Sequence, residues 1–425
     1  MNRLIKPNSK LYSLLSVVAV ALLFVLVLHQ GALAKIEGIS GSAFHFVAKS
    51  GFITTGDGNR VLIWGFANGQ DGTVQYPGPT LILEEGQEVT ITLTNELDEP
   101  ASIVFPGQVR VTATGGKVGL LTREAPPGGT VVYHFTAEHP GTFLYHSGSN
   151  PSLQVEMGLF GAIIVRPQMG DNYAYNSEET KFDREYLFLL SDMDVRIHER
   201  VAFGLKDTVD NTTFFPTYWF INGRNAPDTM SPAFASWLPT QPYNCLPRMH
   251  PGEKMLMRVI GAGRDLHPYH CHGNNAYVIA RDGRLLESAP GKGPDMKVSM
   301  FTIPAAPGQT VDAIFEWTGA NLGWDIYGHA KSDPMEPNEY APDHGKPFPV
   351  TIPGPDDIAY GDFYSGSPFL GNSEPVPPGI PRLNQNGGFF YMWHSHNEKE
   401  MVNYGIFPGG IMTMMIIEHP SVPIE

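Results

Sequence analysis

The chain has 425 residues, enough for two or three domains, and 42% of them are hydrophobic, which excludes a disordered chain. Its 28 Lys and Arg residues against 43 Asp and Glu residues give a net charge of −15, so no nucleic-acid partner is expected. Only 17% of the residues are charged, whereas 46 are glycine and 37 are proline, and this scarcity of helix formers beside many turn formers favours an all-β protein.

The first segment has the pattern of a secretory signal peptide. Basic residues from Arg3 to Lys10 precede an apolar run at 11–28, and Ala-Leu-Ala at 32–34 offers a small-residue cleavage site. The run is long for a signal peptide, so an uncleaved membrane anchor is an alternative. No later stretch is long and apolar enough to span a bilayer. The sequence therefore predicts an exported protein, periplasmic or extracellular, with no membrane insertion after cleavage of residues 1–34.

After this segment, the sequence contains an internal repeat: one pattern of turns and alternating strands occurs twice. The first copy has its blocks at 77–80, 85–93, 127–131, 141–147 and 158–165. The second copy repeats most of them, at 251–259, 307–311, 389–395 and 405–418. Short strands with period-2 alternation, bounded by Gly and Pro, are typical of β-sandwiches.

The two copies predict two β-sandwich domains, at residues 35–170 and 180–425. The last blocks of the second copy are displaced by an insertion at about 318–386. This inserted segment is rich in proline and aromatic residues and has no sustained periodicity. It is therefore expected to be a long surface excursion from the second domain.

Four motifs in these blocks resemble those of the cupredoxin domains of multicopper oxidases. They are Pro-Gly-Pro-Thr at 77–80, Gly-Thr-Phe-Leu-Tyr-His-Ser at 141–147, His-Pro-Tyr-His-Cys-His-Gly at 267–273 and Trp-His-Ser-His at 393–396. The resemblance covers most of the chain after residue 34. It implies two Greek-key cupredoxin-like β-sandwich domains, copper as the cofactor, and a small molecule or a metal ion as the substrate.

In multicopper oxidases, four His-x-His pairs hold a trinuclear copper cluster. By this resemblance, His270 and His272 supply one pair, and His394 and His396 supply a second. Two residues apart on a strand, both members of a pair point to the same face, as a shared metal requires. Imidazole is also a suitable ligand for copper.

The other two pairs are incomplete. His146 remains from one of them, because Gly148 replaces its partner, and Val104 and Pro106 stand where the fourth pair is expected. The resemblance therefore implies a reduced copper site, mononuclear or dinuclear, in place of the full trinuclear cluster.

The type 1 copper centre, which accepts electrons from the substrate in this family, is incomplete as well. His267 matches one of its ligands, but Ser395 stands where the family has its cysteine. The downstream histidine position falls near Glu400, and the axial methionine position falls near Ile406. No ordinary type 1 centre is therefore expected.

Cys271, which lies between two of the candidate ligands, has three interpretations. In an exported protein it can form a disulfide with Cys245. It can also be a small buried apolar residue. The third interpretation is a relocated thiolate ligand that joins His267 and either Met401 or Glu400 in a rearranged copper centre.

The functional prediction is a copper-dependent oxidoreductase, and several alternatives stay open. One is a non-catalytic protein that binds, buffers or delivers copper. Another is an enzyme similar to copper nitrite reductases, because His146, His272 and His394 match residues around the nitrite-reducing copper of that family. Zinc also suits four imidazoles, and a relic histidine group without metal is a further alternative.

The resemblance also bears on assembly. Two-domain relatives hold their metal where domain one of one subunit meets domain two of the next, often in a ring of three. A homo-oligomer, with a trimer as the model, is therefore the expected assembly. In it His146 would face the histidine group of a neighbouring subunit.

Overall fold

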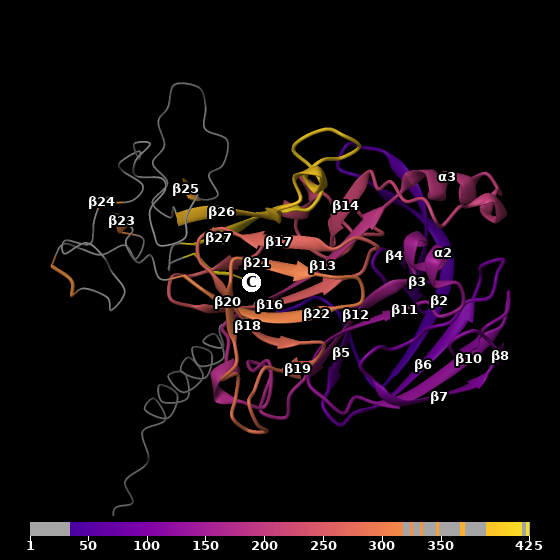
Figure 1. Ribbon diagram of the computed structural model, residues 1–425, viewed down its shortest axis with the longest axis horizontal. Coiled ribbons are helices and arrows are strands. Elements are labelled where there is room, and N and C mark those ends of the chain that lie inside the picture. The colour runs from indigo at the N-terminus through magenta and orange to yellow at the C-terminus, as the bar shows by residue number, and fades with distance from the viewer. Residues whose placement is uncertain are drawn as a thin grey trace, which may run out of the picture.

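The computed structural model describes residues 35–317, 324–325, 332–334, 346–347, 366–369, 388–418 and 422–424. The predicted signal peptide and most of the predicted insertion lie outside these residues. Within them, the chain forms four main β-sheets arranged as two pairs, and the predicted all-β class is confirmed. Figure 1 shows the first pair, coloured indigo to magenta, beside the second, coloured magenta to yellow.

The first sandwich is built from a four-stranded and a six-stranded sheet. The four-stranded sheet has the order β1 (Ile39–Ser40), β5 (Leu81–Glu84), β12 (Phe160–Arg166), β11 (Gly141–His146). The six-stranded sheet has the order β4 (Val74–Gln75), β3 (Arg60–Asn68), β2 (Ala43–Thr54), β6 (Glu88–Asn95), β10 (Thr130–Thr136), β7 (Val109–Gly115). The alternation in β6, where Val89, Ile91 and Leu93 are buried, gives this sandwich its core.

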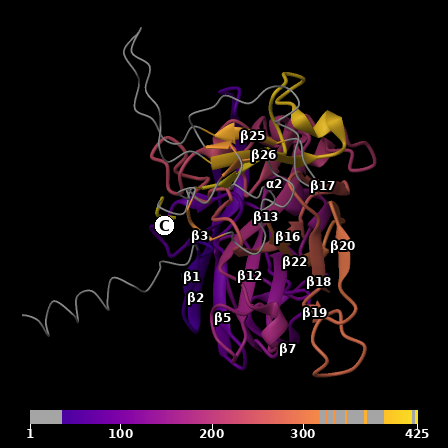
Figure 2. The same cartoon turned by 90° about the vertical axis from the view of Figure 1, so that its left-hand side faces the viewer.

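The second sandwich is built from a seven-stranded and a six-stranded sheet. The larger sheet has the order β14 (Tyr218–Ile221), β13 (Arg184–Met193), β16 (Lys254–Gly261), β22 (Thr310–Glu316), β18 (Ala276–Arg281), β19 (Arg284–Leu285), and β20 (Val298–Met300) also pairs with β18. The smaller sheet has the order β15 (Arg248–Met249), β27 (Met412–Ile417), β26 (Gly388–Ser395), β17 (His267–Cys271), β21 (Thr302–Ala305), and β25 (Gly366–Phe369) also pairs with β26. Figure 2 shows β26 and β17 near one end of the molecule.

A third apolar layer joins the two sandwiches. Phe160, Ala162 and Ile164 of β12 belong to a cluster that also contains Leu187 and Leu189 of β13. Because β12 has the core of its own sandwich on one face and this layer on the other, all of its residues are buried. The two sandwiches are thus held together by a continuous apolar interface.

The remaining elements are short. Outside the four main sheets, the described strands are β8 (Lys117–Val118), β9 (Arg123–Glu124), β23 (Trp324–Asp325) and β24 (Lys346–Pro347). The described helical elements are α2 (Pro151–Met157), α3 (Val195–Ala202), η1 (Glu178–Thr180), η2 (Lys206–Thr208), η3 (Asp228–Met230) and η4 (Glu398–Met401). Helix α2 follows directly on the segment after His146. It starts with Pro151 and ends at Met157, and the next residue is Gly158, whose φ of 116° suits glycine.

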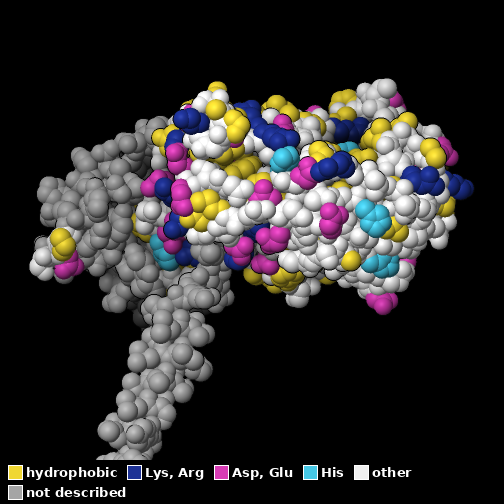
Figure 3. All heavy atoms as spheres, turned by 90° about the horizontal axis from the view of Figure 1, so that it is seen from below, with side chains coloured by type: hydrophobic (Ala, Val, Ile, Leu, Met, Phe, Trp, Pro, Cys, Tyr) yellow, Lys and Arg dark blue, Asp and Glu magenta, His cyan; other side chains and the backbone are white. Residues whose placement is uncertain are grey.

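The visible surface carries charges of both signs. On the face shown in Figure 3, acidic side chains are scattered among the lysines and arginines. No helix among the described residues is long and apolar enough to cross a membrane.

Candidate metal centre

The two His-x-His pairs of the second sandwich lie on neighbouring strands. Strands β17 and β26 are antiparallel, and their register sets His270 opposite His394 and Cys271 opposite Trp393. Since alternate residues point to opposite faces, Cys271 and Trp393 enter the core while the histidines point to the other face. The predicted pairs are therefore brought together by strand pairing alone.

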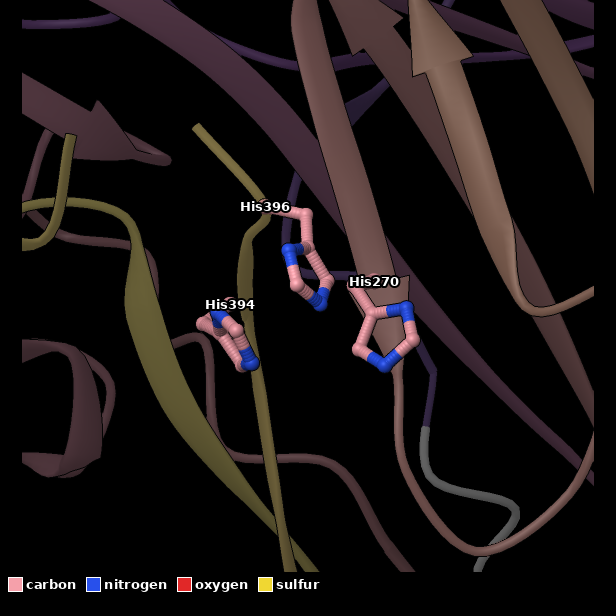
Figure 4. Close-up of side chains that lie close together, drawn as sticks. All are labelled: His270, His394 and His396. Atoms are coloured by element: carbon pink, nitrogen blue, oxygen red, sulfur yellow. The ribbon is translucent and has the colours of Figure 1, made fainter. Parts of the chain in front are cut away.

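The four imidazoles form one group, here called the histidine cluster (His270, His272, His394 and His396). One ligand atom from each of His270, His394 and His396 lies within 4.8 Å of the others. Figure 4 shows these three rings close together, His270 on one strand and the other two on the chain beside it. The Nε2 atom of His272 lies 3.2 Å from the Nε2 atom of His394, so it joins them.

Hydrogen bonds at the Nδ1 atoms orient three of these rings. Nδ1 of His270 lies 2.8 Å from Oγ1 of Thr302, and Nδ1 of His394 donates to the carbonyl oxygen of Ser395 at 2.7 Å. Nδ1 of His396 lies 3.1 Å from Oε1 of Glu398. Such partners orient the rings of ligating histidines, and the carbonyl oxygen of Ser395 also fixes the tautomer of His394, which leaves its Nε2 atom for the metal.

The electrostatics favour the neutral, ligating form of the imidazoles. Burial and the neighbouring histidines lower the pKa of His270 to about 4. Burial also lowers the pKa of His394, and His272 and His396 act in the same direction. At neutral pH both rings therefore keep a lone pair for a metal ion instead of a proton.

The donor set fits a copper or zinc ion. Two nitrogens that are each about 2.0–2.1 Å from one tetrahedral ion lie roughly 3.3 Å apart, close to the 3.2 Å between the Nε2 atoms of His272 and His394. Four imidazoles without a metal would need hydrogen-bond partners for eight ring nitrogens. His394 is buried, whereas the side chain of His396 is 49% exposed, so the cluster opens to solvent on one side.

His267 lies outside this cluster, in a buried group with two carboxylates. Its Nδ1 atom is 2.9 Å from Oε2 of Glu400, and its Nε2 atom is 3.4 Å from Oδ2 of Asp192. Burial opposes protonation of His267, but Asp192 and Glu400 outweigh it and raise the pKa to about 9. The two positions that the resemblance assigns to the type 1 centre, His267 and Glu400, thus do meet, but as an ion pair.

Both cysteines are free, so the disulfide between Cys245 and Cys271 is not formed. Each thiol lies in the core of the second sandwich, and burial raises the pKa of both. The Sγ atom of Cys245 donates to the carbonyl oxygen of Ile221 at 3.0 Å. Among the three interpretations of Cys271, its surroundings favour the buried apolar residue, because its side chain lies among the apolar side chains of the core.

His146 lies in the first sandwich, at the end of β11, and is not part of the histidine cluster within one chain. Its backbone pairs with Val104, which occupies a position of a missing histidine. A Cβ atom on Gly148 would come within 2.7 Å of a methyl group of Val104, so a larger residue here would have to displace that side chain. Nδ1 of His146 donates to the carbonyl oxygen of Ser147 at 2.8 Å, which directs the lone pair to Nε2.

Sequence reasoning missed two residues of these sites. Thr302 lies on β21 and is brought to His270 by strand pairing, and Asp192 lies on β13 in the opposite sheet of the sandwich. Neither belongs to a motif with recognisable spacing. The place of Glu400, in contrast, was predicted near the type 1 ligand position.

Comparisons with known proteins agree with this geometry. Residues 66–170 match the family model described as multicopper oxidase. Over 116 residues the chain is 36% identical to copper resistance protein A of Escherichia coli, covering 27% of this chain and 18% of that protein. The chain matches only 15–27% of the length of such curated relatives.

Two solved structures share the fold. A blue copper oxidase from Nitrosomonas europaea aligns with a TM-score of 0.56 at 20% identity, covering 88% of this chain and 85% of the other. A copper-containing nitrite reductase from Thermus scotoductus aligns with a TM-score of 0.51 at 15% identity, covering 90% of this chain and 63% of the other. The family match, the curated relatives and the shared fold together support membership of the multicopper oxidase superfamily, and the multicopper oxidase homologues imply copper as the metal.

Proposed function

We propose that this chain is an exported oxidoreductase that holds copper at a reduced, mononuclear or dinuclear, histidine site and has no ordinary type 1 centre. The observation that carries the proposal is the convergence of four imidazoles from two neighbouring strands, with the Nε2 atoms of His272 and His394 3.2 Å apart. Bound copper would supply one-electron redox chemistry towards a small molecule or a metal ion.

The residues of this chain have separate tasks in that site. His270, His272, His394 and His396 would hold the metal. Thr302 and the carbonyl oxygen of Ser395 orient two of the rings through their Nδ1 atoms. The half-exposed side of the cluster, at His396, is where a substrate would approach.

The proposal is tested by activity on phenols. Reduction of dioxygen by four electrons requires the full cluster of the family, and Val104, Pro106 and Gly148 replace three of its ligands. Purified copper-loaded protein should therefore oxidise a phenolic dye no faster than the same concentration of free copper. Robust turnover that disappears in His394→Ala would show that this cluster works as a laccase-like centre and would refute the reduced site.

A second expectation concerns colour. The intense blue colour of type 1 copper comes from a cysteine thiolate ligand, and here Ser395 is at that position while Cys271 is buried in the core. The copper-loaded protein should be colourless or faintly coloured in a visible absorption spectrum. A strong blue colour that is abolished by Cys271→Ser would establish a relocated thiolate ligand instead.

A non-catalytic copper carrier is the second candidate function. It is favoured by the exposure of His396, because an exposed ligand at the end of a strand lets a metal exchange with an acceptor. Rapid transfer of copper to a colorimetric chelator, together with no redox turnover of any small molecule or metal ion offered, would decide for the carrier. Metal analysis of the purified protein distinguishes copper from zinc.

His146 suggests a site shared between subunits. It keeps a directed Nε2 lone pair although its companions in the first sandwich are absent, and burial lowers its pKa. We expect a homo-oligomer in which His146 faces the histidine cluster of a neighbouring subunit. Light scattering with and without a chelator measures this: a monomer in both conditions, with copper still bound by His146→Ala, would confine the site to the second sandwich.

A further inference from the structure

The group of Asp192, His267 and Glu400, here called the ionic clamp, occupies the place that the family uses for type 1 copper. Its three residues come from β13, from the start of β17 and from η4. All three are buried, at 3%, 0% and 0% exposure respectively. A buried imidazole between two buried carboxylates requires an explanation, because an unpaired charge there is costly.

This group does not fit a type 1 copper ion. Both nitrogens of His267 already face carboxylate oxygens, at 2.9 Å and 3.4 Å. The other oxygen of Glu400 accepts a hydrogen bond from Nδ2 of Asn397 at 2.9 Å. Oδ2 of Asp192 accepts one from the amide of Asp265 at 2.8 Å. Ser395, at the position of the family's cysteine, offers a hydroxyl in place of a thiolate and accepts a hydrogen bond from the amide of Asn397.

The clamp also joins the two chain segments that carry the histidine cluster. His267 is three residues before His270 on β17, and Glu400 is four residues after His396. A second link lies beside it, because the amide of His396 donates to the carbonyl oxygen of Pro268 at 2.8 Å. His396 lies just beyond the end of β26, so it has fewer strand contacts than His270 and His394 to hold it.

We propose that Asp192, His267 and Glu400 are positioning residues, a metal-excluding ionic clamp that has replaced type 1 copper and holds His396 against His270. The claim that the clamp sets the copper geometry at the histidine cluster rests on the proposed function. The claims that the clamp excludes metal and anchors residues 395–403 do not rest on it. By the resemblance, the type 1 ligand positions lie on these same two segments, so the clamp links the segments that a type 1 copper would link. It carries no electrons.

The test uses Glu400→Gln, which keeps the shape of the side chain but removes its charge. The matched control is Glu253→Gln. Glu253 also pairs with a histidine, His250 at 3.1 Å, and with Arg184 at 3.0 Å, but it lies just before β16, away from the two segments of the clamp. Hydrogen exchange of the metal-free proteins should be faster at residues 395–403 in Glu400→Gln and unchanged there in Glu253→Gln. Equal exchange in both variants would overturn the anchoring role.

Copper binding supplies the second readout. In Glu400→Gln, the copper dissociation constant should rise by about tenfold, and the electron paramagnetic resonance spectrum of Cu²⁺ should change, as expected when the support of a ligand is weakened. Glu253→Gln should match the wild type in both. An unchanged spectrum and affinity in Glu400→Gln would refute the positioning role even if the protein were less stable.

The exclusion of metal is tested separately. The double variant His270→Ala with His394→Ala should retain no copper at the clamp, because both nitrogens of His267 face carboxylate oxygens on opposite sides of the ring. Residual copper that is removed by a further His267→Gln change would show that the clamp is itself a metal site and would overturn the inference. If the wild type binds no copper at all, the proposed function fails, and the hydrogen-exchange comparison still decides the anchoring role.

Discussion

Replacing His394 with alanine should abolish copper binding by the purified protein. His394 is buried at the centre of the histidine cluster, and its Nε2 atom faces that of His272 at 3.2 Å. Loss of even an outer partner of a ligand typically weakens metal binding by about 10–100-fold, so loss of a ligand should weaken it by more than about 100-fold. Copper titration of the metal-free protein, followed by equilibrium dialysis and metal analysis, measures this.

The matched control is His134→Ala. His134 is exposed on β10, where its ring forms a hydrogen bond with the hydroxyl of Thr90, so its loss should leave copper binding unchanged. Circular dichroism would verify that both variants fold. Copper retained at wild-type affinity by His394→Ala would mean that the cluster is a relic and that copper, if bound, is held elsewhere.

The histidine cluster could be predicted from the sequence because its geometry follows from local rules. Alternation along a strand places both members of each His-x-His pair on one face, and the resemblance to multicopper oxidases assigns both pairs to one metal site. The structure adds the register that sets His270 opposite His394. Strand pairing between segments more than 120 residues apart along the chain is a long-range contact that no local pattern in this sequence fixes.

The ionic clamp was not predictable in the same way. His267 was recognised as a type 1 ligand by resemblance, and Glu400 only as the residue near a missing histidine. Asp192 completes the group from a strand of the opposite sheet. In the sequence it is one acidic residue in an apolar strand and belongs to no motif. A motif indicates which ligands a family has at a position. The ionic clamp at that position in this chain instead depends on contacts between segments that are distant in the sequence.

The interface between the two sandwiches depends on another buried charged group that the sequence does not reveal. Arg166 of β12 makes two hydrogen bonds with Glu185 of β13, one of them at 2.6 Å. Nε of Arg258 lies 3.1 Å from the same carboxylate, and Nη1 of Arg258 lies 3.7 Å from Oδ1 of Asp312. All four side chains are buried, so each charge depends on the others for compensation.

Glu185→Gln should therefore be strongly destabilising, because it leaves two buried guanidinium groups with one fewer negative charge. Removal of one partner from a buried ion pair costs about 3–5 kcal/mol in the free energy of unfolding. Denaturant unfolding of the metal-free proteins measures this cost. Glu179→Ala, which removes an exposed carboxylate, is the control and should change the free energy of unfolding by less than about 0.5 kcal/mol.

The same carboxylate should make the stability of the wild type sensitive to acid. Burial opposes ionisation of Glu185, but Arg166 and Arg258 outweigh it and lower the pKa below its ordinary value. A carboxylate whose pKa is lower in the folded state stabilises the protein above its unfolded pKa, and this contribution is lost as the pH falls through the folded pKa. The difference in unfolding free energy between wild type and Glu185→Gln should therefore be constant near neutral pH and shrink in acid. A difference that stayed constant throughout, or one below about 1 kcal/mol at neutral pH, would mean that the apolar layer of β12 and β13 holds the sandwiches together without help from these charges.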